Sequence, residues 1–251
     1  CGTCRHCQGG FPNRCQSLTL FGVTANGGMA DLLVVPEHCV YPLAEGVSTT
    51  MGALCEPLAV CLRAVRLANV KPGDRVAVLG AGSIGLTAIV AARAAGAGEV
   101  YITARHPHQR QLAQNLGASA VFADGKEAAE TLGDQHVDVV IETVGGEANT
   151  LTEAIYLARP GGAIAILGAF AGTPEVPAFL FMAKELKLVG SSCYGHDGPV
   201  GDFALATQLA GQYQNELLPL VSHTFALDQA TEAFATAADK STQSIKVHIC
   251  P

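Results

Sequence analysis

Short apolar runs alternate with longer mixed segments through the middle of the chain. Each apolar run is rich in Val, Ile or Ala and has the length of a buried strand. The six expected strands are 75–79, 100–104, 120–122, 137–142, 163–167 and 186–191. The expected helices between them are 84–95, 109–116, 126–132 and 148–157. Apolar strands separated by helices are typical of a parallel sheet that is covered on both faces.

The flanking segments are less regular. Before the repeating pattern, we expect a strand at 29–35 that Pro36 stops, and a helical stretch at 47–68 that is interrupted near Pro57. After it, the expected elements are a helix at 200–213, a strand at 220–225, a helix at 229–238 and a strand at 245–249. The overall prediction is an α/β protein with a doubly wound, six-stranded parallel sheet.

Composition narrows the classes of partner. The formal net charge of the 251 residues is −7, and no run of basic residues occurs. Nucleic acid and anionic membrane surfaces are therefore not expected partners. No apolar run is long enough to cross a bilayer. The remaining expectation is a protein that acts on small molecules.

The motif GAGSIG follows the first expected strand and opens the first expected helix. This strand–loop–helix context makes it a dinucleotide-binding (Rossmann) fingerprint. Gly80 permits a tight turn, Gly82 lets the backbone approach a pyrophosphate, and Gly85 lets the helix pack on the strand. Ser83 and Ile84 begin the helix whose free N–H groups would face the phosphates. The alternative is an ordinary glycine-rich turn.

The end of the second expected strand indicates which nucleotide binds. An enzyme that uses NAD places an acidic residue there for the ribose 2′-hydroxyl, about twenty residues past the loop. This chain has Ala104 instead, and Glu99 lies at the other end of the strand. Arg105 is placed to meet a 2′-phosphate, with Arg110 near enough to assist. NADP is therefore expected over NAD, unless Arg105 is merely solvated and either nucleotide is accepted.

Four of the nine cysteines crowd into the first fifteen residues. Cys1, Cys4, Cys7 and Cys15 have x2, x2 and x7 spacings, which allow four thiolates to surround one ion. Four sulfur ligands predict a structural zinc site. The alternatives are two disulfides or an iron–sulfur cluster. An odd cysteine total with this clustering favours a reducing compartment, so we expect a cytoplasmic protein.

Taken together, these motifs resemble one family over essentially the whole chain. The matching segments, in order, are CGTCRHCQGGFPNRC, GGMADLLVVPEHCVYPLAEGVS, GALCEPLAVCLRAV, VKPGDRVAVLGAGSIGL, DVVIETVG and PGGAIAILG. They are similar to the zinc-dependent medium-chain dehydrogenases/reductases of the alcohol dehydrogenase superfamily. The EPLAV segment resembles the sorbitol and threonine dehydrogenase-like branch.

The resemblance implies a second, catalytic zinc site. In that branch the Glu of EPLAV belongs to it, which assigns Glu56 to the catalytic zinc. Cys55 is the adjacent alternative, and a simple helix-opening carboxylate is another. The resemblance also assigns cofactor binding to Val144 and places Leu167, Gly168, Ala169 and Ser192 along the nicotinamide half.

The resemblance also implies a division of the chain. Residues 1–55 are expected to be the remnant of a β-rich, GroES-like catalytic domain with the structural-zinc lobe. Residues 56–200 are expected to be the Rossmann coenzyme domain. Residues 201–251 are expected to complete it and return to the catalytic domain. The family's upstream segment, with a Cys and a His zinc ligand, is not in this sequence, so an N-terminally truncated and inactive fragment is expected.

The expected activity is zinc-dependent hydride transfer between NAD(P) and an alcohol, a polyol or the corresponding aldehyde or ketone. One alternative is a zinc-free, quinone reductase-like NADPH oxidoreductase. Another is a non-enzymatic NADP-binding sensor. The expected partner is a small alcohol or carbonyl substrate, and the resemblance implies a homo-oligomer, either a dimer or a tetramer.

Overall fold

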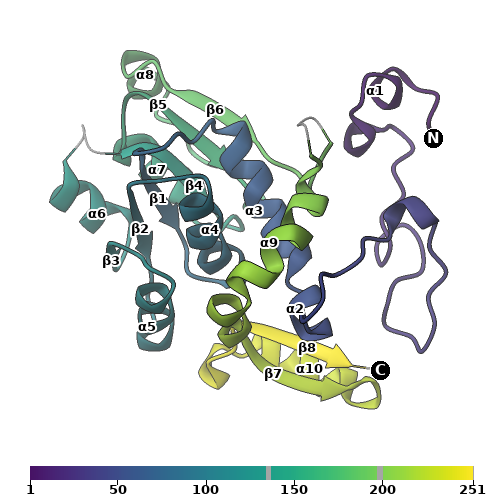
Figure 1. Ribbon diagram of the computed structural model, residues 1–251. Coiled ribbons are helices and arrows are strands. Elements are labelled where there is room, and N and C mark those ends of the chain that lie inside the picture. Colours follow the sequence, from purple (N-terminus) through teal and green to yellow (C-terminus); the bar gives the residue numbers. More distant parts are fainter. Residues whose placement is uncertain (134–136, 197–199, 251) are drawn as a thin grey trace. The chain divides into compact units, whose positions relative to one another are not determined.

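The computed structural model describes residues 1–133, 137–196 and 200–250 (Figure 1). The chain forms two compact units. One joins Cys1–Cys55 with Tyr194–Pro251, and the other is Glu56–Cys193. We call Glu56–Cys193 the sheet unit and the other the split unit. In the part of the chain that is described, no helix is both long and apolar enough to cross a membrane.

The sheet unit contains the predicted six-stranded parallel sheet, in the order β3-β2-β1-β4-β5-β6. Its strands are β1 (Arg75–Leu79), β2 (Glu99–Thr103), β3 (Ala120–Phe122), β4 (Val137–Glu142), β5 (Ala158–Ile166) and β6 (Lys187–Gly190). The chain runs outward from β1 to β3 and then returns to β4 beside β1. This reversal puts the carboxyl ends of β1 and β4 at the position where doubly wound sheets bind ligands. The doubly wound fold is confirmed.

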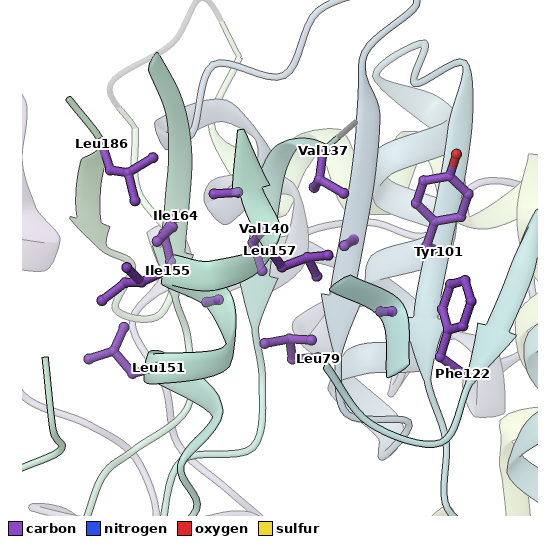
Figure 2. Close-up of a cluster of buried hydrophobic side chains, with 14 residues drawn as sticks. Leu79, Tyr101, Phe122, Val137, Val140, Leu151, Ile155, Leu157, Ile164 and Leu186 are labelled. Atoms are coloured by element: carbon purple, nitrogen blue, oxygen red, sulfur yellow. The ribbon is translucent and has the colours of Figure 1, made fainter. Parts of the chain in front are cut away.

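Helices cover the two faces of this sheet. Its helices are α3 (Cys55–Leu67), α4 (Ser83–Ala94), α5 (Pro107–Asn115), α6 (Gly125–Leu132), α7 (Thr150–Leu157) and α8 (Ala178–Ala183). Contacts join α4 with α5, and α7 with α6 and α8, which agrees with one group on each face, as right-handed crossovers require. The side chains of Ile155 and Leu157 on α7 and of Ile164 on β5 are completely buried in one cluster (Figure 2). Each such side chain contributes roughly 1.5–3 kcal/mol of transfer free energy.

The split unit combines the 16-residue helix α9 with shorter elements. Its helices and turns are α1 (Arg5–Gln8), η1 (Pro12–Arg14), η2 (Glu37–Cys39), α2 (Thr49–Gly52), α9 (Asp202–Leu217), η3 (Leu218–Leu220), η4 (Leu227–Gln229), α10 (Ala230–Ala238) and η5 (Lys240–Thr242). Strands β7 (Val221–Ala226) and β8 (Lys246–Cys250) pair in parallel, with α10 as their crossover. Phe203 packs between two tyrosine rings, with ring centroids 4.9 Å from Tyr41 and 5.0 Å from Tyr194.

One predicted strand is wrong. Residues 29–35 have no regular secondary structure, and Leu32 and Val34 are 90% and 93% exposed. A strand is stable only when a neighbouring strand satisfies its backbone groups. Among the described residues, none pairs with 29–35. The apolar composition of MADLLVV was therefore not a sufficient signal.

Candidate functional site

The glycine loop joins β1 to α4 and is held by close backbone packing. Gly80 has a φ of +101°, a region that favours glycine. Gly85 lies directly against Gly80, and a Cβ on Gly85 would collide with the carbonyl of Gly80. These two glycines therefore fix the shape of the turn, as the sequence motif predicted.

Gly82 has a different role. It is the N-cap of α4, its φ is an ordinary −76°, and no atom lies within 4 Å of the position where its Cβ would be. The space beside Gly82, at the start of α4, is thus open. The first N–H groups of a helix have no partner within the helix, so this end favours anions. The loop fits a dinucleotide pyrophosphate.

Two threonines brace the loop, and sequence analysis missed both. The hydroxyl of Thr103 accepts a hydrogen bond from the N–H of Gly80 at 2.8 Å. The hydroxyl of Thr143 donates to the carbonyl of Leu79 at 2.7 Å. Each threonine lies at or just past the carboxyl end of a strand beside β1. A polar residue that ends an apolar run was the available signal.

The region after β2 carries the predicted nucleotide determinant. Ala104 is buried, and Arg105 is exposed. Glu99 lies at the opposite end of β2, where its Oε2 is 2.7 Å from Nε of Arg75. Burial raises the pKa of the half-buried Glu153 on α7, and the positive charge of Arg105 acts in the opposite direction. Arg105 and Glu153 therefore share the same corner of the sheet unit.

The loops after β4 and β5 lie together beside the glycine loop. Val144 is 45% exposed, and its Cγ2 is 2.6 Å from the position where a Cβ on Gly80 would be. The N–H of Gly146 donates to the carbonyl of Ala169 at 2.8 Å, and this bridge joins the two loops. The structure thus brings Val144 and Ala169 to the same edge of the sheet.

The remaining predicted nicotinamide residues follow the neighbouring strands. Leu167 and Gly168 come directly after β5, and Ser192 lies just past β6 and is exposed. The N–H of Ser191 donates to the carbonyl of Ile166 at 2.9 Å, which keeps the end of β6 beside the end of β5. These positions are compatible with a common ligand-facing edge.

The four N-terminal cysteines converge in the split unit. The sulfur atoms of Cys1, Cys4, Cys7 and Cys15 all lie within 4.8 Å of one another. The Sγ atom of Cys15 is 3.5 Å from Sγ of Cys1 and 3.9 Å from Sγ of Cys4. A tetrahedral zinc site with Zn–S bonds of 2.3 Å separates its sulfurs by about 3.8 Å. The donor set fits zinc.

Hydrogen bonding favours the thiolate form of Cys4, whereas the neighbouring sulfurs of Cys4 and Cys15 raise the pKa of Cys7. The backbone N–H of Cys7 is the main cause that lowers the pKa of Cys4 to about 7. The N–H of Ser17 also donates to Sγ of Cys15, at 3.3 Å. Metal-bound thiolates are commonly held by such neighbouring donors. All nine cysteines are free thiols in the structure.

Glu56 lies in the first turn of α3 and is exposed. Among the described residues, the four cysteines are the only group of three or more side chains arranged to hold a metal. The assignment of Glu56 to a zinc site stays a prediction. Cys55 is buried, and burial raises the pKa of its thiol.

Comparison with known proteins gives the family. The profile of the zinc-binding dehydrogenase family matches residues 83–210. A protein of Arthroderma otae assigned as D-xylulose reductase A is 35% identical over 93% of this chain and 67% of its own length. L-idonate 5-dehydrogenase of Vitis vinifera is 31% identical over 98% of this chain and 69% of its own length.

Comparison with solved structures gives the same family. A Sinorhizobium meliloti protein assigned as a zinc-binding dehydrogenase, solved with bound NADP, matches with a TM-score of 0.89 and 32% identity. The match covers 100% of this chain and 74% of that one. The chain belongs to the zinc-binding dehydrogenase family, a class of oxidoreductases.

Proposed function

We propose that the chain is part of a zinc-dependent dehydrogenase that transfers hydride between NAD(P) and an alcohol or polyol, or the corresponding carbonyl compound. The observation that carries this proposal is the open space at Gly82, in front of α4 and at the reversal point of the sheet. The names of the relatives from Arthroderma otae and Vitis vinifera support a polyol or sugar-acid substrate.

The sheet unit is the proposed coenzyme domain. Its first α4 N–H groups would bind the pyrophosphate, and Gly80 and Gly85 keep the loop tight enough to present them. Val144, Leu167, Gly168, Ala169 and Ser192 are proposed to line the nicotinamide half. Residues Cys1–Cys55 are proposed to belong to the catalytic domain. The part after residue 200 is proposed to return to it.

Two zinc roles are proposed. The four cysteines would hold a structural ion, because four sulfur ligands leave no position open for substrate. Glu56 would belong to a catalytic site, where zinc supplies a Lewis acid that polarises the substrate oxygen. The cysteine cluster and the family match disfavour the zinc-free quinone reductase alternative. A homo-oligomer and a cytoplasmic location stay predictions.

NADP is the proposed nucleotide. Ala104 offers no carboxylate to a ribose 2′-hydroxyl, and the exposed Arg105 next to it can pair with a 2′-phosphate. The NADP bound to the Sinorhizobium meliloti relative is consistent with this choice.

The test is binding of NADPH and NADH to the 251-residue chain, followed by nucleotide fluorescence. Arg105→Ala should weaken NADPH binding by about tenfold and leave NADH binding within about twofold, because only NADPH carries the 2′-phosphate. Lys187→Ala removes an exposed positive charge at the start of β6, at the opposite edge of the sheet, and should change neither affinity. Equal wild-type affinities would refute the NADP preference. Failure to bind either dinucleotide would refute the proposed function.

A further inference from the structure

Glu142, the last residue of β4, is a completely buried carboxylate at the carboxyl edge of the sheet. It lies in register between Leu79 of β1 and Ile166 of β5, so it occupies the centre of the sheet. Burying a carboxylate is costly unless several donors replace water. The contacts of Glu142 therefore call for an explanation.

One oxygen of Glu142 collects three hydrogen bonds. Its Oε1 accepts from the N–H of Val144 at 2.8 Å, the N–H of Gly145 at 2.9 Å and the hydroxyl of Thr150 at 2.7 Å. This single atom fixes the turn after β4 and ties it to the start of α7. Gly145 has a φ of +61°, so the turn is one that most residues would not adopt unaided.

The same residue also holds the turn after β5. Its backbone carbonyl accepts from the N–H of Leu167 at 2.9 Å and the N–H of Gly168 at 3.2 Å. Its Oε2 is buried, has no hydrogen-bond partner among the described residues, and lies against Gly168, where a Cβ would collide with it. Glu142 is thus the common support of the two turns.

We propose that Glu142 is a positioning residue for the nicotinamide half of the dinucleotide. This inference rests on the proposed function, because the turns that Glu142 supports carry Val144, Leu167 and Gly168. The Oε1 atom of Glu142 accepts a hydrogen bond from the N–H of Val144 and so fixes the position of this exposed residue beside Gly80. Among the described residues, the hydrogen bonds of its side chain go to Val144, Gly145 and Thr150 and none goes to the glycine loop, so a probe without nicotinamide should depend on it less.

The experiment compares probes with and without nicotinamide. NADPH is paired with 2′-phospho-ADP-ribose, and NADH with ADP-ribose, on the wild-type chain and on Glu142→Gln. The glutamine keeps the size of the side chain but removes its charge and places an NH2 group where one oxygen stood. Binding of the intact dinucleotide should weaken by about tenfold, while the truncated probe should stay within about twofold.

Two further variants keep the test decisive. Thr150→Val removes one of the three donors with little change in shape, and should weaken dinucleotide binding by about threefold, again sparing the truncated probe. Asp138→Asn alters the only other carboxylate of β4, at the opposite end of the strand, and should change neither affinity. Because Thr150→Val is mild, it answers the question even if Glu142→Gln does not fold.

The outcomes separate two kinds of failure. Equal losses for both probes, or no loss in either variant, would overturn the positioning role while leaving the proposed function intact. A wild-type chain that binds neither intact dinucleotide would overturn the proposed function, and this inference with it.

Discussion

The sheet unit and the cysteine lobe at Cys1–Cys15 achieve order in different ways. In the sheet unit, whole strands and helix faces are removed from water. In the lobe, Cys15 is the only buried residue, and α1 is four residues long with no side-chain cap. A segment with so little apolar burial needs a crosslink or a metal to be stable. The four converging thiols provide the ligands for one.

The largest expected effect is the loss of ordered structure in residues 1–15 when one of the four thiols is removed. Cys15→Ser should abolish binding of the proposed structural zinc, because it removes one of the four sulfur ligands. Binding of structural zinc contributes on the order of 10 kcal/mol to small metal-dependent folds. Residues 1–15 should then exchange amide hydrogens freely, while the core of the sheet unit stays protected. Hydrogen exchange and metal analysis together measure this.

Cys39→Ser is the matched control. Cys39 is exposed and lies outside the cluster, so its variant should keep the zinc content of the wild-type chain and normal protection of the lobe. A Cys15→Ser chain that retained zinc and stayed protected would show that the lobe is ordered by something other than the four thiols.

Within the sheet unit, substitutions of two glycines in the same loop should have different effects, one on stability and the other on dinucleotide binding. Gly85→Ala should destabilise the chain by about 3 kcal/mol, at the upper end for an overpacked site, because its Cβ would collide with the backbone carbonyl of Gly80. Gly82→Ala should change the free energy of unfolding by less than about 1 kcal/mol, since its surroundings are open. It should nevertheless weaken dinucleotide binding, because the methyl group enters the phosphate space.

Urea unfolding and nucleotide titration of the two variants measure this difference. If Gly82→Ala bound dinucleotide as tightly as the wild-type chain, the open space in front of α4 would not be the phosphate site. If Gly85→Ala were as stable as the wild-type chain, the close contact with Gly80 would not be a constraint on the fold.

The features that could be predicted from the sequence are those that depend on a local pattern of residues. Strands 120–122 and 137–142 were placed to the residue, because a buried strand between turn signals is a local pattern. The cysteine spacing correctly indicated that four thiols would meet. The prediction of a strand at 29–35 was wrong because the pairing of a strand with a neighbour cannot be inferred from the local sequence. Helix α8 was missed because a short apolar run does not distinguish a helix from a strand.

The candidate site was predictable only in part. The glycine loop and the missing carboxylate at Ala104 are visible in the sequence, since each depends on position along one βαβ unit. The support of the two turns by Glu142 is not, because its hydrogen bonds with Val144 and Thr150 depend on how the loop folds back on the end of β4. A charged residue that ends an apolar strand, as in VDVVIE, was the only available signal.

The smallest expected effect tests whether polar contacts add to the stability of the apolar sheet. Asp138 accepts hydrogen bonds from the N–H of Arg75 at 2.8 Å and from Nε of Arg159 at 2.6 Å. Burial opposes ionisation, but these two donors and the charges of both arginines outweigh it and lower the pKa of Asp138. The side chain of Arg159 is 40% exposed, so screening limits the contribution to about 1 kcal/mol. Asp138→Asn should lower the free energy of unfolding by about this much at neutral pH.

The effect should depend on pH. Because the pKa of Asp138 is lowered in the folded state, the stabilisation is fully present above the unfolded pKa of about 3.9. It disappears as the pH falls through the folded value. Urea unfolding should therefore show a gap between wild type and variant at pH about 6 that narrows below pH about 4. A gap that persisted unchanged at the lower pH would mean that the carboxylate charge is not its source.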